Sequence, residues 1–540
     1  MFKENREHLQ QTFLSSIAWM SEEVKNKLLK SWASVYYEEV FCKIDETIFA
    51  CLYSVETGRI NFPVNILLSL EYFKHIFDYS DEELINQFYF NVQISYALGL
   101  KNVGELNLAP RTLYYFRERI NKYVEINPQK EDLIYQAFLE LTKKFVEEVK
   151  IKTKEQRMDS TLIKSNIKDS SRLALAMDVL GQAIKVMPMD IFTDEIKRYI
   201  SKNYRNSILY KTKSSDVKTK LKNIIEFCIE IRDYAHNILK MNATTEIKTL
   251  NRFIEEQTKN TNIGIYEIKE NKEIKSSFLQ SAYDTDATYK KKSKKESKGY
   301  VVNIAETCSD ENGFQIITDY VVEKNIKSDI SMAKERFYRI NDEYDCEKMY
   351  LDGGYYGDEL EDIAKECKIK TNYTNMVGGI IEKDGINISD FEISNDYKVC
   401  KCPMGAKAIG AYYSNDLIKA CFLKVDCGMC KMKNKCIVEE GKDFYRLIAR
   451  KKTLTAELVR NDIIENKKVN TSRRVAIEGT NSELKRRHKL DDTKIRGLKR
   501  MRLVVGLKIT ACNIKRLIKN TVANANKSIK LFNQVQSVTN

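Results

Sequence analysis

The segment KMYLDGG, residues 348–354, decides the fold class of this chain. Its run Met349 to Leu351 is short and apolar, which predicts a buried strand, and Asp352 stands where that strand ends. Gly353 and Gly354 let the backbone turn sharply and leave room for a ligand beside the carboxylate. Taken alone, Asp352 is also explained as a turn former.

Further strands and helices are predicted on both sides of this segment. In chain order they are a strand at 156–163, strands at 299–305 and 314–322, a helix at 331–338, the strand 348–351, a helix near 359–367 and a strand near 370–375. The polar turn DENG at 310–313 joins the second and third strands into a β-hairpin. This order predicts an α/β layer fold with one mixed sheet.

The flanking regions have a different periodicity. Up to about residue 150 apolar residues recur at helical spacing, Ser80 and Glu83 have the spacing of a capping box, and Pro110 opens another helix. On that last helix Arg117 lies among other basic and aromatic residues, a mixture suited to gripping phosphates, although a solvated charged helix explains it equally well. Residues 170–280 return to helical periodicity, which predicts a helical insertion.

Length and charge limit the classes of protein. A chain of 540 residues and 62.9 kDa is too long for one hydrophobic core, so we expect two or three domains. The 90 basic and 76 acidic residues give a formal charge of +14, which favours a polyanionic partner, unless lysine merely solvates the surface. No apolar stretch approaches the roughly 20 residues of a membrane span, and we expect a cytoplasmic protein that associates with the nucleoid.

Three acids are candidate metal ligands. Asp159 lies in the predicted strand 156–163, where a buried carboxylate needs a cation or solvent, and the alternative is an exposed acid on an edge strand. Further along, Arg474, Glu478 and Lys485 fall within about 40 degrees of one another on a helix. That face can hold a metal and adjacent phosphates, but an Arg474–Glu478 surface ion pair predicts the same spacing.

The run RRVAIEGTNSELKRR, residues 473–487, contains Arg474-x3-Glu478-x6-Lys485 and resembles a signature of bacterial insertion-sequence transposases. The signature usually starts with a tyrosine three residues before the arginine, where this chain has Thr471. The segments MDST at 158–161 and LDGGY at 351–355 resemble the strands that carry the two aspartates of the same enzymes. The resemblance covers most of the chain apart from the helical insertion.

The resemblance implies an RNase-H-like catalytic domain in which Asp159, Asp352 and Glu478 hold Mg²⁺ or Mn²⁺ and drive cut-and-paste transposition. The expected partner is double-stranded DNA, at the element's ends and the target, bound by a homodimer in the synaptic complex. The expected DNA-binding residues are Arg117, Arg474, Lys485, Arg486 and Arg487. The alternatives are a non-catalytic DNA-binding protein and a metal-dependent nuclease without strand transfer.

The expected domains are a helical DNA-binding domain at 1–150, the catalytic domain at 151–495 and a basic C-terminal helix and tail at 496–540. Two modules interrupt the catalytic domain, at 170–280 and 385–442. Within Lys485–Lys519, basic residues are expected to follow the DNA backbone, while Leu503, Val504 and Leu507 can instead pack the domain.

Cysteines cluster in the second of these modules. Six of the thirteen lie between positions 400 and 436. Two short cysteine hooks a few tens of residues apart suit tetrahedral zinc, and the favoured ligands are Cys402, Cys427, Cys430 and Cys436. The alternative is a set of reduced structural thiols. The four histidines are scattered, so a histidine metal site is not expected.

Overall fold

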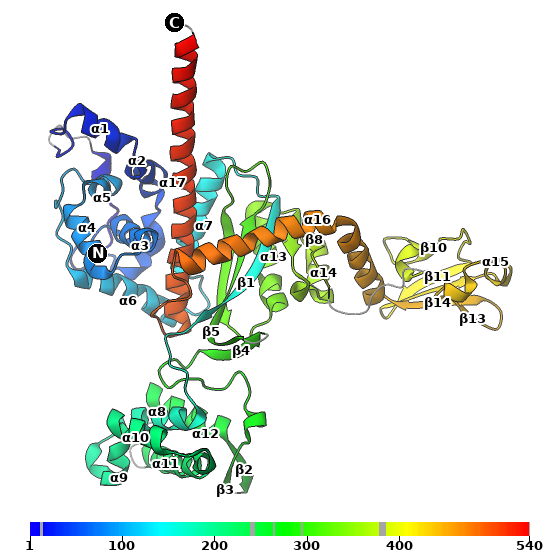
Figure 1. The fold of residues 1–540 in the computed structure, drawn as a ribbon, viewed down its shortest axis with the longest axis horizontal. Helices are drawn as coiled ribbons and strands as arrows, with labels where there is room; N and C mark the ends of the chain where they lie inside the picture. The colour runs from blue at the N-terminus through cyan, green and yellow to red at the C-terminus, as the bar shows by residue number, and fades with distance from the viewer. Residues whose placement is uncertain (11–14, 238–243, 263–264, 293–294, 377–384, 539–540) are drawn as a thin grey trace.

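The computed structural model of the chain describes residues 1–10, 15–237, 244–262, 265–292, 295–376 and 385–538 (Figure 1). Helices gather at the N-terminus, a mixed sheet lies at the centre, and two smaller modules extend away from that sheet. None of the described helices is long and apolar enough to cross a membrane.

The N-terminal region is helical, as predicted. Its helices are α1 (Glu22–Leu29), α2 (Trp32–Glu39), α3 (Val64–Phe77), α4 (Asp81–Phe90), α5 (Val92–Ala97), α6 (Pro110–Ile126) and α7 (Leu133–Glu148), with short 3-10 turns at Glu7–Leu9, Phe41–Lys43 and Glu46–Leu52. The capping box is confirmed: the Ser80 hydroxyl accepts from the Glu83 amide, and the Glu83 carboxylate accepts from the Ser80 amide. Pro110 is the first residue of α6, also as predicted.

The central sheet is mixed, which confirms the predicted α/β class. Its strands are β1 (Glu155–Lys164), β4 (Thr288–Lys292), β5 (Lys295–Thr307), β6 (Ile317–Lys324), β7 (Lys348–Leu351) and β8 (Lys370–Tyr373). Strand β5 lies antiparallel between β1 and β6, while β1, β7 and β8 run parallel. Strand β4, a short antiparallel partner of β5, was not predicted. The predicted helices are α13 (Asp329–Tyr344) and α14 (Asp358–Glu366).

The region predicted as a helical insertion is largely helical and has its own apolar core. It contains α8 (Arg172–Lys185), α9 (Asp194–Lys197), α10 (Lys202–Lys211), α11 (Val217–Asn237) and α12 (Thr245–Gln257), followed by a hairpin of β2 (Thr258–Asn262) and β3 (Ile265–Ile268). Figure 1 shows this module apart from the other helices, beyond β4.

The cysteine-rich region is a small β module. Its sheet has the order β11 (Gly410–Ser414), β12 (Leu417–Phe422), β14 (Tyr445–Arg450) and β13 (Glu439–Glu440), beside β9 (Glu392–Ile393), β10 (Val399–Lys401) and the short helix α15 (Lys424–Gly428). Apolar side chains such as Phe391, Phe422 and Leu447 form a separate core here. The module lies at the far end of α16 (Lys451–Arg486) in Figure 1.

Two long helices tie these parts together. Helix α16 runs from the cysteine-rich module and crosses the central sheet, and α17 (Leu498–Val538) follows it. Leu503 and Leu507 are buried in the same core as the N-terminal helices, with Val504 packed against it. The apolar positions of the basic C-terminal segment therefore pack the fold, which was one of the two expected roles.

Candidate active site

The three predicted acids meet around one arginine, Arg474. Its Nη2 lies 3.2 Å from Asp159 Oδ1 and 3.7 Å from Asp352 Oδ2, and its Nη1 lies 2.8 Å from Glu478 Oε1. Asp159 comes from β1, Asp352 follows the end of the neighbouring parallel strand β7, and Glu478 lies on α16. Residues far apart in the sequence thus bring three carboxylates to one place above the sheet.

The three acids differ in their exposure to solvent. The side chain of Asp159 is 12% exposed, that of Asp352 29% and that of Glu478 58%. Burial raises the pKa of Asp159, and the negative charge of Asp352 adds to this, while the Arg474 guanidinium opposes it. Asp159 therefore forms the closed side of the site and Glu478 the open side.

Asn481 is a fourth member of the site that the sequence reasoning missed. Its amide Nδ2 donates to Asp159 Oδ2 at 3.1 Å, on the opposite oxygen from Arg474. Asn481 lies seven residues after Arg474, or about two helical turns, so the helical spacing that selected Arg474 and Glu478 also indicates it.

The turn after β7 fixes Asp352. Its Oδ1 accepts from the Gly354 amide at 2.8 Å, while the Gly353 amide donates to Asn375 Oδ1 at 2.7 Å. A Cβ at Gly353 would lie 2.5 Å from the Asn375 carbonyl oxygen, which is too close for any side chain. The close approach of the chain explains Gly353, and the turn leaves Asp352 Oδ2 directed at Arg474.

A buried ionic network holds α16 on the sheet. Glu306 on β5 is fully buried; Arg157 Nε and Nη2 donate to its Oε2 at 2.7 and 2.5 Å, and Arg516 Nη1 donates to its Oε1 at 2.6 Å. Thr480 on α16 also donates to Glu306 Oε1 at 2.5 Å, and Arg157 Nη1 donates to the Arg473 carbonyl at 3.0 Å. These contacts fix the register of α16 over β1, and with it the position of Glu478.

The other predicted DNA-binding residues have varied surroundings. Lys485 pairs with Asp491 at 3.3 Å, whereas Arg486 and Arg487 are exposed. Arg487 also lines a cavity of about 460 Å³ together with Lys515 and Lys519. The expectation that these residues contact DNA stays a prediction.

Arg117 is held inside the N-terminal helices. It donates to the buried carboxylate of Glu71 through Nε at 2.8 Å, and to Asp81 through Nη1 and Nη2 at 2.9 and 2.7 Å. Hydrogen bonds from Arg117 are the main cause that lowers the pKa of Asp81. A phosphate would have to compete with these carboxylates, so the contacts give Arg117 a structural role, and its predicted contact with DNA stays a prediction.

The four favoured cysteines line one cavity. Cys402, Cys427, Cys430 and Cys436 all face a cavity of about 810 Å³, and Cys400 and Cys421 are not among its lining residues. The Cys402 Sγ accepts from the Ala406 amide at 3.3 Å. No three of these thiols lie within 4.8 Å of one another, so a zinc ion with Zn–S bonds of about 2.3 Å requires the hooks to close further.

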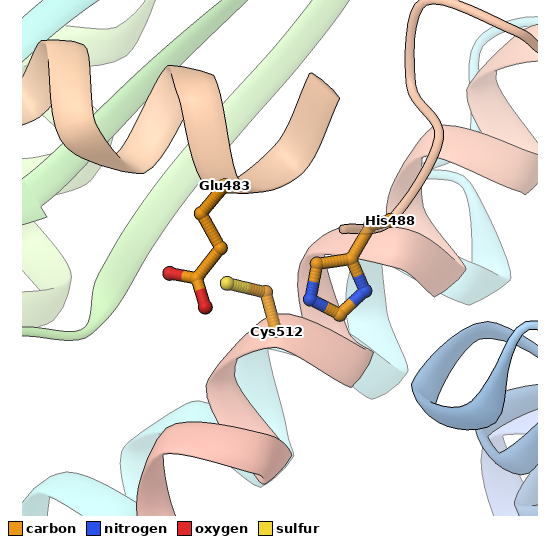
Figure 2. A group of neighbouring side chains, drawn as sticks. All are labelled: Glu483, His488 and Cys512. Atoms are coloured by element: carbon orange, nitrogen blue, oxygen red, sulfur yellow. The ribbon is translucent and has the colours of Figure 1, made fainter. Parts of the chain in front are cut away.

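A different group has the closest set of potential ligand atoms among the described residues. Single atoms of Glu483, His488 and Cys512 lie within 4.8 Å of one another (Figure 2). The His488 side chain interacts through Nδ1 with the His75 carbonyl, and Arg516 donates to Glu483 at 2.9 Å. Because Arg516 already occupies the carboxylate, we assign this unpredicted group to the packing of α16 on α17.

Comparison with known families gives two matches. A transposase DDE domain matches residues 401–518, and a transposase domain of the DUF772 family matches residues 23–119. The first match includes Arg474 and Glu478, whereas Asp159 and Asp352 lie outside both. No curated protein and no solved structure matches the chain.

Proposed function

We propose that this chain, a DDE-type transposase of the insertion-sequence class, binds the ends of its own element and moves it by metal-dependent DNA cleavage and strand transfer. The observation that carries the proposal is the convergence of Asp159, Asp352 and Glu478 on Arg474. Two of these acids lie outside the residues that the family models match, so their position in the fold is independent support.

The donor set suits a hard divalent cation. Asp159, Asp352 and Glu478 offer only carboxylate oxygens, the ligands that Mg²⁺ and Mn²⁺ prefer. Such ions, when bound, would activate the attacking oxygen and stabilise the leaving oxygen of a phosphodiester. Asn481 orients the Asp159 carboxylate, and the exposed side of the site at Glu478 admits the DNA strand.

An RNase-H-like architecture is proposed for the catalytic domain. In support, one mixed sheet carries Asp159 on β1 and Asp352 at the end of the neighbouring parallel strand. The domain limits of 1–150, 151–495 and 496–540, with insertions at 170–280 and 385–442, remain our proposal. The separate cores of the two insertions support these limits, and the C-terminal segment is a helix that packs in the core of the N-terminal helices.

Double-stranded DNA is the proposed partner, bound by a dimer that synapses two ends. The formal charge of +14 favours a polyanion, and the exposed Arg486 and Arg487 at the end of α16 lie on the helix that carries Glu478. We also propose a structural zinc ion in the cysteine-rich module, held by the four cysteines that line its cavity.

The test is a cleavage and strand-transfer assay on DNA that carries the element's own ends. Wild type is compared with Asp352→Asn, which keeps the shape of the side chain and removes its charge, and with Asp358→Asn, a control at the start of α14. We expect Asp352→Asn to bind the DNA ends but to lose cleavage and joining, while the control retains both.

Each rival function predicts a different result. A wild type that binds the ends without cutting them supports the non-catalytic DNA-binding protein, and cutting without joined products supports the nuclease. Undiminished cleavage by Asp352→Asn would refute the role of the three acids.

A further inference from the structure

Arg474 lies where a cation bound by the three acids would lie. Its guanidinium contacts Asp159, Asp352 and Glu478 through its two terminal nitrogens, at 3.2, 3.7 and 2.8 Å. The Arg474 side chain is only 15% exposed, and its Nε is buried without a hydrogen-bond partner. One positive charge is therefore shared among three carboxylates in a partly desolvated place.

The guanidinium and a divalent ion compete for the space between these oxygens. Mg²⁺ demands near-ideal ligand geometry with oxygens at about 2.0–2.1 Å, which brings its carboxylate oxygens close together. No oxygen atoms of all three acids lie within 4.8 Å of one another, since the guanidinium lies between them. Binding one metal ion through all three acids therefore requires the Arg474 guanidinium to move out from between them.

The contacts that hold α16 in place do not involve the Arg474 side chain. Arg157 holds the Arg473 carbonyl, Thr480 donates to buried Glu306, and Asn481 donates to Asp159. These contacts flank Arg474 along the helix and none involves its guanidinium. A long side chain on a fixed helix can exchange partners by rotamer changes alone, without movement of Glu478.

We propose that Arg474 is a positioning residue that competes with the divalent metal for Asp159, Asp352 and Glu478. When DNA binds, Arg474 exchanges the carboxylates for a backbone phosphate, and the three acids become available to the metal. This inference rests on the proposed function. Arginine binds phosphate through two parallel hydrogen bonds, so a backbone phosphate near the acids can replace the carboxylates that it gives up. The metal affinity of the three acids would then rise when DNA binds.

The competition has a direct test in metal affinity without DNA. The full-length chain is titrated with Mn²⁺ while electron paramagnetic resonance measures the free ion, for wild type, Arg474→Ala and Arg474→Gln. Removing a positive charge from among three carboxylates should tighten Mn²⁺ binding by on the order of tenfold. The matched control is Arg473→Ala, which removes a neighbouring arginine that pairs with Asp310 instead; its Mn²⁺ affinity should equal that of wild type.

A second measurement tests the release by DNA. With duplex DNA of the element's end present, the Mn²⁺ affinity of wild type should rise toward that of Arg474→Ala, whose own affinity should change less. By thermodynamic linkage, Mn²⁺ should then strengthen DNA binding by wild type more than DNA binding by Arg474→Ala.

The outcomes separate this inference from the proposed function. Mn²⁺ binding that is equal or weaker in both Arg474 variants overturns the competition but leaves the metal site and the transposase reaction standing. Absence of Mn²⁺ binding in every variant, including wild type, overturns the competition and the metal-binding role of the three acids together. If Arg474→Ala binds Mn²⁺ more tightly than wild type, but DNA does not raise the Mn²⁺ affinity of wild type, the release of the acids by DNA is overturned.

Discussion

Replacing Glu306 by glutamine should loosen α16 from the sheet. Glu306 is fully buried and accepts four hydrogen bonds, from Arg157, Arg516 and Thr480. A glutamine of the same size has no charge and turns an amide N–H toward these donors. Arg516 keeps Glu483 as a partner, but Arg157 keeps only the Arg473 carbonyl.

The expected cost follows from this uncompensated guanidinium. Removing one partner of a buried ion pair typically destabilises a protein by about 3–5 kcal/mol, because a charge is left buried without its counterion. Arg157 is buried and has no other carboxylate partner among the described residues, so Glu306→Gln should fall in this range.

Native-state hydrogen exchange measures this cost locally. Peptides from β1, β5 and the second half of α16 should exchange roughly a hundredfold faster or more, since about 1.4 kcal/mol corresponds to a factor of ten. The insertion at 170–280, with its separate core, should be unaffected. The control is Glu347→Gln, which removes the exposed partner of Lys154 and should change exchange by less than fivefold. A rise of less than threefold in Glu306→Gln would refute the reasoning.

Three further perturbations follow from other sites. Arg117→Ala should lower the stability of the N-terminal helices by about 3–5 kcal/mol, since it leaves the buried Glu71 unpaired, and tryptophan fluorescence in urea should report this. Burial lowers the pKa of His488 to about 4. The unfolded state therefore binds a proton more tightly at this position, and the free energy of unfolding of wild type should fall by about 3 kcal/mol as pH falls from about 6.5 to 4. His488→Gln should flatten that part of the pH profile of the urea midpoint. Cys427→Ser/Cys430→Ser should abolish zinc in the purified protein, measured by elemental analysis.

Each of these has a control and a contradicting outcome. Arg111→Ala removes an exposed arginine from the same helix and should leave stability unchanged, so an equal effect of both variants contradicts the ion-pair argument. If the urea midpoint of His488→Gln depends on pH as strongly as that of wild type between pH 6.5 and 4, the conclusion that burial keeps His488 neutral is contradicted. Cys400→Ser changes a cysteine outside the cavity and should retain zinc. Absence of zinc from the wild-type protein would contradict the proposed zinc site.

Local patterns predicted the secondary structure well. Strand β7 spans the predicted residues 348–351, and the capping box at Ser80 forms as its spacing predicts. Both depend on neighbours within a few residues, where backbone sterics and local hydrogen bonds decide the outcome. Strand β4 escaped prediction because its sequence TYKKK is polar and charged, and only pairing with β5 makes it a strand.

The candidate site divides in the same way. Residue types and spacing selected Asp159, Asp352 and Glu478, and a family signature linked them, but no pattern indicated that all three meet at Arg474. The network at Glu306 was missed as well, because its members come from β1, β5, α16 and α17, and a lone glutamate in a strand has no local signature.

The sequence by itself determined the chemistry available to this protein: its strands and helices, its three acids, its basic surplus and its clustered cysteines. Only the tertiary structure decided which charges meet. In the fold, Arg117 pairs with a buried carboxylate among the N-terminal helices, and the guanidinium of Arg474 lies among the three acids. Arg486 and Arg487 remain exposed at the surface. The physical reason is that a charge can be buried only where the fold supplies a partner, and partners distant in sequence become neighbours only through packing.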